Sequence, residues 1–284
     1  VRSIDWSAHL DAQSTLAVDC QTLRSKITHS HYAALKVKDA IVDQFRACEN
    51  SRPSVDLRRP DLRINARISG TQATISLDLS GESLHRRGYR KDGSEAPLKE
   101  NLAAAILMRA GWLDIAATGG SLFDPLCGSG TLVIEAALIA GDSAPGLTRA
   151  HFGFLKWKQH QPHIWQRQLE AARARRRKGM QSLPVIMGCD NDERAVQSAR
   201  ANAVRAQVDV HVQFEQRELR DTPDPKFCSG LLVTNPPYGE RMGEERALKA
   251  LYADLGSVIK EHFTGWKAAV FTGRPDLGRY LSLR

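Results

Sequence analysis

The chain has 284 residues, of which 42% are hydrophobic and 25% charged, as in ordinary soluble globular proteins. That length fits one large domain or two smaller ones. No apolar run approaches the roughly 20 residues of a membrane-spanning helix, and no signal-peptide pattern opens the chain, so we expect no membrane association. Because the first residue is Val1, we expect the chain to be a fragment of a longer protein.

The cysteine pattern favours a cytoplasmic protein. The five cysteines are odd in number and widely spaced, and none forms a C-x-x-C pair. This argues against a disulfide framework and against a structural zinc site. A reducing compartment and small, buried thiols fit best.

The positive charge is concentrated in one segment. The net charge is +8, and the stretch from Arg149 to Lys178 holds nine Lys or Arg residues and a single acid, Glu170. The rest of the chain is balanced overall. A concentrated basic segment in a soluble protein indicates a polyanionic partner.

Residues 1–80 form the first predicted region, a small α/β domain. Apolar residues at helical spacing predict an amphipathic helix over 29–46. Apolar and polar residues alternate over 62–68 and again over 73–79, which predicts two strands. Gly70-Thr71 lies between them and predicts a hairpin turn.

Residues 81–96 form a predicted basic connector, in which all the Lys and Arg residues lie between His85 and Lys91. After it, Pro97 is predicted to start a helix that Gly111 ends, because these are the positions that proline and glycine favour.

Residues 97–284 form the second predicted region, an α/β domain interrupted by an insertion at 141–184 that holds the basic segment. Helices are expected after the first, second and fourth strands, through residues 140, 203 and 263. Repeated β-α units predict a parallel sheet with helices on both faces. The predicted strands cover 122–124, 185–189, 208–214, 230–234 and 267–272.

A glycine-rich turn, DPLCGSGT at 124–131, links the first of these strands to a helix. Glycines let the backbone approach a ligand closely, and the helix start offers free N–H groups. A dinucleotide site would have a third glycine where this chain has Val133, which favours a different nucleoside ligand. By itself the pattern is equally consistent with a tight strand-to-helix turn.

Asp190 ends the next strand and could accept hydrogen bonds from both ribose hydroxyls of an adenosine. The alternative is that Asp190 or Asp192 caps the helix that follows.

The loop NPPYGER at 235–241 follows an apolar strand and carries the most specific signal. Two prolines stiffen the backbone and remove N–H donors, so carbonyl oxygens and the Asn235 amide oxygen dominate. Such a loop accepts hydrogen bonds from an NH2 group, and Tyr238 offers a flat face for a base. A simple proline turn would not explain this combination. If the strands containing Leu122 and Leu231 are neighbours where the strand order reverses, the two loops face each other.

These motifs resemble the class I methyltransferases that act on exocyclic amines. The N-terminal region, with AALKVKDAIVD at 33–43 and LDLSG at 77–81, resembles a THUMP domain, an RNA-binding module, and LHRRGYR at 84–90 fits the same family. Nearly the whole chain resembles the N-terminal enzyme of the bacterial 23S rRNA guanine-N2 methyltransferases, which is often fused to a second methyltransferase.

The resemblance implies a Rossmann-like class I methyltransferase sheet behind a smaller α/β THUMP domain. It also implies S-adenosylmethionine as cofactor, 23S rRNA or a large-subunit precursor as partner, and guanine 2445, in the standard numbering of that RNA, as the target. A fused second methyltransferase would lie C-terminal to this chain. The THUMP region is entered part-way, and the final antiparallel hairpin of a seven-stranded sheet is absent.

Residue roles follow from the motif matches. Asp124, Gly128 and Gly130 would shape the pocket for the methionine end of the cofactor, with Cys127 and Thr131 in the same loop. Asp190 would hold the ribose, and Glu218 would meet the adenine amino group, although relatives often have Asp there. The target guanine would be held by Asn235, Pro236 and Tyr238, and Asn235 would also border the cofactor.

RNA phosphates are expected to contact the connector and the insertion. Aromatic residues of the insertion (Phe152, Phe154, Trp157 and Trp165) would pack beneath its cations, and the alternative is a solvated helix with an aromatic inner side. His160 and His163 could bind a metal, but no cysteine or acidic cluster joins them, so no metal site is predicted. The predicted RNA contacts are Arg86, Arg87, Arg90, Lys156, Arg175, Arg176 and Arg177.

Other functions remain open. A tRNA guanine-N2 methyltransferase would share these motifs. A DNA adenine or protein glutamine methyltransferase could use the same loop, but the THUMP-like region and the basic insertion argue against both. An RNA-binding ribosome assembly factor could keep the fold without turnover, although the intact Asn235 and Asp190 argue against it.

Overall fold

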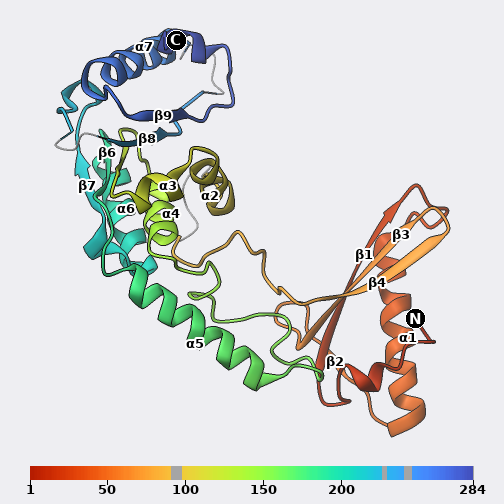
Figure 1. The fold of residues 1–284 in the computed structure, drawn as a ribbon. Helices are drawn as coiled ribbons and strands as arrows, with labels where there is room; N and C mark the ends of the chain where they lie inside the picture. Colours follow the sequence, from red (N-terminus) through yellow and green to blue (C-terminus); the bar gives the residue numbers. More distant parts are fainter. Residues whose placement is uncertain (91–97, 226–228, 240–244, 284) are drawn as a thin grey trace. The chain divides into compact units, whose positions relative to one another are not determined.

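The computed structural model describes residues 1–90, 98–225, 229–239 and 245–283. The chain divides into two compact units (Figure 1). The first consists of Val1–Leu84 with Arg149–Arg167, and the second of His85–Thr148 with Gln168–Arg284. The division therefore runs through the predicted connector at 81–96 and through the predicted insertion at 141–184.

The first unit is an α/β domain with a four-stranded sheet in the order β2-β1-β3-β4. The hairpin prediction is confirmed, because β3 and β4 are antiparallel and Ser69 pairs with Gln72 across Gly70-Thr71. The helix α1 contributes Ile41, Val42 and Phe45 to the core. The elements are η1 (Trp6–Ala8), β1 (Thr15–Leu23), α1 (Ser30–Glu49), β2 (Ser54–Val55), β3 (Leu62–Ser69) and β4 (Gln72–Asp78).

Strand β1 was not predicted, yet it is central to this sheet. It pairs in parallel with both β2 and β3. Only Leu16 and Ala17 at its start are buried, and from Val18 on the strand alternates between half-buried and exposed residues. A strand with so short an apolar run lacks the alternation that identified β3.

The second unit contains a parallel five-stranded sheet in the order β7-β6-β5-β8-β9, which confirms the predicted fold class. The strands are β5 (Ser121–Asp124), β6 (Ile186–Asp190), β7 (Gln213–Gln216), β8 (Gly230–Thr234) and β9 (Lys267–Val270). The helices are α2 (Glu100–Arg109), α3 (Trp112–Ala117), α4 (Thr131–Ala140), α5 (Pro162–Gly179), which continues from the first unit, α6 (Glu193–Ala206) and α7 (Glu245–His262). Short 3₁₀ turns are η2 (Asp209–His211), η3 (Leu219–Asp221) and η4 (Leu277–Leu281).

Helices cover both faces of this sheet, and successive strand residues alternate between them. Leu122 and Leu231 pack with α2, α3, α4 and α6 in one core cluster. Phe123 and Leu232 pack with α7 and η4 in the other. Within the described residues, no helix is long and apolar enough to cross a membrane.

One sequence prediction, a strand, needs correction, and another, the start of a helix, lies outside the described residues. The strand predicted over 208–214 begins only at Gln213, because α6 ends in a left-handed turn at Gln207 and Asp209–His211 form a 3₁₀ turn. Pro97, predicted to start a helix, lies outside the described residues. The helix it was to open ends at Arg109, just before Gly111.

The connector residues Arg87 and Tyr89 are interior residues of the second unit. Tyr89 is 1% exposed, and its hydroxyl donates to Glu135 Oε1 on α4 at 3.0 Å. Arg87 is 9% exposed, and its Nη2 lies 3.5 Å from Glu135 Oε2. Burial raises the pKa of Glu135, while Arg87 and Tyr89 act in the opposite direction. This part of the connector therefore fastens α4, the helix that follows the glycine-rich turn.

We expect Arg87→Ala to lower the free energy of unfolding by about 3–5 kcal/mol, because it leaves the Glu135 carboxyl buried without its cation. Urea denaturation measures the loss. Arg173→Ala, at an exposed position of α5, is the matched control and should change it by less than about 0.5 kcal/mol. Equal midpoints for the two variants would contradict the structural role of Arg87.

Candidate active site

The glycine-rich turn lies between β5 and α4. Asp124 ends β5, is 1% exposed and accepts a hydrogen bond from the Leu126 amide at 3.1 Å. Gly128 and Gly130 both have left-handed backbone, with φ of 53° and 82°. The Asn202 side chain on α6 donates to Ser129 O at 2.9 Å and so holds the turn against α6.

The two glycines are required for different reasons. A Cβ on Gly130 would lie 2.9 Å from both Ala199 Cβ and Phe214 Cζ, so a side chain there would collide with α6 and β7. A Cβ on Gly128 would meet nothing within 4 Å. Gly130 therefore packs the turn against the fold, and Gly128 presents its backbone to open space where a ligand can approach.

Asp190 lies directly against this turn. Its Oδ2 accepts the Gly128 amide at 2.8 Å, and its Oδ1 accepts the Asp192 amide at 3.0 Å. Asp192 is the residue that caps α6, accepting the Arg194 amide at 2.9 Å. The two acids thus have separate tasks, and the carboxylate of Asp190 keeps lone pairs for a ligand.

The electrostatics of the turn centre on Asp124. Burial raises the pKa of the Asp124 carboxyl to about 7, and the nearby charge of Asp190 adds to the rise, although the Thr234 hydroxyl and the Leu126 amide oppose it. Asp124 can therefore gain or lose a proton near neutral pH, which its ordinary value would not allow.

The loop after β8 lies beside the glycine-rich turn. Leu122 of β5 pairs with Leu231 of β8, which confirms that these strands are neighbours, and the strand order reverses between them. All five residues of β8 are buried. Asn235 follows immediately, and its Oδ1 is buried without a hydrogen-bond partner among the described residues. A buried acceptor without a donor is uncommon and is expected where a ligand supplies the donor.

The rest of this loop is partly described. Pro236 is buried and Pro237 exposed. Tyr238 is half-buried, and its ring lies beside Gly273, in the segment that follows β9. Glu240 and Arg241, the last residues of the motif, lie outside the described residues.

The other predicted cofactor residues differ in position. Glu218 is exposed and follows β7, at the same edge of the sheet as Asp190. Cys127 is buried, and its amide donates to Cys189 O at 2.8 Å. Burial raises the pKa of its thiol well above the ordinary value, so the thiol stays un-ionised. The Thr131 hydroxyl is buried and accepts a hydrogen bond from Arg90, so Cys127 and Thr131 help to build the turn.

Three of the arginines predicted to contact RNA form hydrogen bonds or ion pairs within the protein. Arg176 is half-buried and donates to the Ala206 and Gln207 carbonyls at the end of α6, at 3.2 and 3.0 Å. Arg90 donates to Leu98 O at 2.9 Å as well as to Thr131. Arg87 is buried beside Glu135, as described above. These three side chains hold the fold together instead of lying free on a surface.

The remaining predicted cations are exposed. In the second unit, Arg175 Nε lies 2.8 Å from Asp142 Oδ2, and Arg177 is exposed on the same helix. In the first unit, Lys156 Nζ lies 2.7 Å from Asp61 Oδ1. Arg86 is exposed in the connector. Surface ion pairs of this kind are weak and can be exchanged for a phosphate.

The aromatic residues of the insertion form a cluster in the first unit. Trp165 packs edge-on against Phe152 and Phe154, with ring centroids 5.2 and 5.0 Å away. Trp157 does not join them. It stacks instead on His9, and its Nε1 donates to His9 Nδ1 at 3.1 Å. The first part of the basic segment is thus tied to the N-terminal domain.

Comparison with known proteins identifies both parts of the chain. Residues 87–284 match the model of the RMKL-like methyltransferase domain, and residues 1–78 match that of the THUMP domain. The chain is 58% identical to the ribosomal RNA large subunit methyltransferase K/L of Syntrophotalea carbinolica and 51% identical to that of Methylococcus capsulatus. All of the chain is matched in both cases, but it spans only 40% and 38% of these relatives' length.

Solved structures agree with this family. One, described as a predicted N6-adenine-specific DNA methylase from Listeria monocytogenes, is 29% identical with a TM-score of 0.85, over 100% of this chain and 72% of the other. SMU.472, assigned as a methyltransferase and crystallised with SAH, is 30% identical with a TM-score of 0.83, over 100% of this chain and 73% of the other. The chain belongs to the family of RMKL-like methyltransferase domains, and it carries a THUMP domain in front of that domain.

Proposed function

We propose that this chain transfers a methyl group from S-adenosylmethionine to the N2 amine of a guanine in 23S rRNA. The observation that carries the proposal is the buried Asn235 oxygen, which has no donor among the described residues and lies at the strand exit next to the glycine-rich turn. The names of the relatives, ribosomal RNA large subunit methyltransferases, support the choice of RNA.

The residues around the turn fit the cofactor. The open side of Gly128 and the first amides of α4 suit its methionine end, and Asp190 suits the ribose hydroxyls. Glu218 follows the neighbouring strand, where the adenine would lie. The SAH bound to SMU.472 supports the same class of ligand. When bound, S-adenosylmethionine supplies an electrophilic methyl carbon on a sulfonium.

The loop after β8 fits an amine substrate. Asn235 Oδ1 and the Pro236 carbonyl can accept the two hydrogens of the guanine amine, which would direct the nitrogen lone pair toward the glycine-rich turn. The same acceptors stabilise the positive charge that develops on nitrogen during transfer. Asn235 is no general base, because an amide cannot hold a proton at neutral pH. As the nitrogen–carbon bond forms, the methyl–sulfur bond would break, S-adenosylhomocysteine would leave, and the methylated nitrogen would release one proton to water. Alignment of this kind can contribute about 7–11 kcal/mol.

Tyr238 would receive the base once it leaves its stack. Extruding a base costs a few kcal/mol, and stacking on an aromatic ring returns about 1–3 kcal/mol. The THUMP domain and the exposed cations Arg86, Lys156, Arg175 and Arg177 would bind the RNA backbone. We place this reaction in the cytoplasm. The exact target guanine and the fused second methyltransferase stay predictions.

Methylation of a DNA adenine is the second candidate, since the description of one structural relative includes that activity. An adenine N6 amine presents the same two hydrogens to Asn235. The THUMP domain favours RNA. Methyl transfer to protein-free 23S rRNA, to tRNA and to double-stranded DNA, measured side by side, distinguishes the candidates, and transfer to DNA or tRNA alone would overturn the proposal.

We expect Asn235→Ala to lower the methylation rate by at least about 100-fold, by analogy with the loss of one preorganised hydrogen-bond donor from an oxyanion hole. Cofactor affinity, measured by titration calorimetry, should stay within about twofold, because the glycine-rich turn is intact. Asn101→Ala, at an exposed asparagine on α2 of the methyltransferase domain, is the control and should behave as wild type. A fully active Asn235→Ala variant would end the proposal.

The raised pKa of Asp124 predicts a pH-dependent stability. The folded chain holds a proton on Asp124 up to about pH 7, whereas the unfolded chain loses it near 3.8. Stability from this group is therefore present below about pH 4 and is lost as the pH rises to 7, by at most about 1.4 kcal/mol per unit. Asp124→Asn imitates the protonated form. Urea denaturation should therefore show its free energy of unfolding rising relative to that of wild type between pH 5 and pH 8. Parallel pH profiles would show that Asp124 is ionised throughout.

Arg177→Ala should weaken RNA binding and reduce the slope of log affinity against log salt by about one, the effect of one lost phosphate contact. Filter binding at four salt concentrations measures both. Lys260→Ala, exposed on α7, serves as the control. An unchanged slope for Arg177→Ala would favour the alternative of a merely solvated α5.

A further inference from the structure

We infer that the segment Phe271–Arg274 is a second wall of the target-base site and that Gly273 is a positioning residue for Tyr238. This inference rests on the proposed function, because it assumes that Tyr238 receives the base. The sequence analysis gave this segment no functional role. It predicted a strand over 267–272, whereas β9 ends at Val270 and the segment follows it.

The segment runs alongside the exit of β8. Val270, the last residue of β9, pairs with Thr234, the last residue of β8. The pairing extends one residue further, because the Phe271 amide donates to the Thr234 carbonyl at 2.9 Å. The residues that follow Phe271 therefore leave the sheet next to Asn235, on the side away from β5.

Gly273 meets the ring of Tyr238. A Cβ on Gly273 would lie 3.2 Å from Tyr238 Cε2, 3.3 Å from Cδ2 and 3.5 Å from Cζ. The first two distances are shorter than an ordinary carbon contact, so any side chain would push the ring by a few tenths of an ångström or more.

The backbone of Gly273 does not itself require glycine. Its φ lies outside the left-handed region, and the residue is exposed, so neither a tight turn nor a packed core excludes a side chain. The contact with Tyr238 is what a side chain would disturb. Glycine at this position lets the ring lie flush against the main chain.

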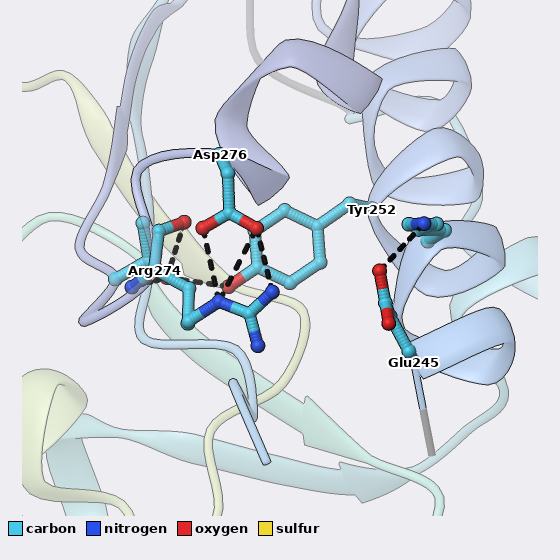
Figure 2. Close-up of polar contacts among 6 residues, drawn as sticks. Glu245, Tyr252, Arg274 and Asp276 are labelled. Carbon is cyan, nitrogen blue, oxygen red and sulfur yellow. Dashed lines mark hydrogen bonds and ion pairs between the residues drawn. The ribbon is translucent and has the colours of Figure 1, made fainter. Parts of the chain in front are cut away.

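Hydrogen bonds hold the segment in place (Figure 2). Tyr252, fully buried on α7, donates its hydroxyl to Thr272 Oγ1 at 2.8 Å. The Arg274 amide donates to the same oxygen at 3.1 Å. The Arg274 guanidinium pairs with Asp276, with Nε to Oδ1 at 2.9 Å and Nη2 to Oδ2 at 2.6 Å. The wall that supports Tyr238 is thus itself anchored to α7 and to the turn before η4.

Gly273 covers one edge of the Tyr238 ring, so a base would have to stack on the part of the ring that Gly273 leaves uncovered. A displacement of about 1 Å in a substrate-positioning group can reduce a rate by about 100-fold. Small changes of volume at Gly273 should therefore act on the rate of methyl transfer and leave cofactor binding unchanged.

The test compares Gly273→Ala and Gly273→Val with Gly278→Ala in single-turnover methylation of 23S rRNA. We expect a loss of about 5–10-fold for Ala and about 100-fold for Val, scaled from the effect of a 1 Å displacement. Gly278→Ala adds the same methyl group where nothing lies within 4 Å and should behave as wild type. The Kd for S-adenosylhomocysteine and the Tm should be unchanged in the Gly273→Ala variant.

A double variant separates positioning from a general structural effect. In a Tyr238→Ala background there is no ring to displace, so Gly273→Ala should cause no further loss. An equal loss in both backgrounds, or no loss from Gly273→Val in wild type, would overturn the inference. A fully active Tyr238→Ala variant would instead overturn the proposed role of Tyr238. Should Gly273→Val fail to fold, Tyr252→Phe tests the same wall by removing its anchor, and should lower the rate with unchanged cofactor affinity.

Discussion

The pairing of β5 with β8 is the constraint on which the candidate site depends. Three residue pairs join these short strands, and both are buried. Because the strands are parallel, their carboxyl ends lie at one edge of the sheet, and the chain leaves each in a loop of different chemistry. One loop is rich in glycine and backbone N–H groups, and the other is rich in oxygen acceptors. If β8 slipped by one residue against β5, Leu232 would turn to the wrong face of the sheet and the two loops would no longer be level.

The site departs from the usual rules for a protein interior in ways that suit a ligand. Asp124 is buried, and its pKa is raised to about 7. The Asn235 side-chain oxygen is buried and has no hydrogen-bond donor among the described residues. Gly128 has open space beside its Cα. Each of these would weaken a core that had only to be stable. Together they leave hydrogen-bonding capacity and open space that a cofactor and a base could fill.

The arginines of the chain divide into two groups that composition alone does not separate. Arg87 and Arg176 are buried or half-buried and donate to a carboxylate or to helix carbonyls, so we expect their removal to lower stability. Arg177 and Arg86 are exposed, and their removal should affect RNA binding. The basic segment is also shared, because its first part packs with the THUMP domain and its last part with the methyltransferase domain.

The sequence by itself determined the fold class, the hairpin at Gly70-Thr71 and the chain order of the five strands in the methyltransferase domain, although not the separate helix α3. It also indicated the turn at 124–131, Asp190 and the loop at 235–241 as candidate parts of a site. These features depend on local periodicity and on glycine and proline, whose effects act within a few residues. Only the tertiary structure decided that Asp190 contacts Gly128, that Asp192 and not Asp190 caps α6, and that Arg87 is an interior residue. It alone revealed β1, whose apolar run is too short to be recognised, and the contact of Gly273 with Tyr238. Apart from the local cap at Asp192, these features arise where segments far apart in the chain meet, and no pattern within one segment records its distant neighbour.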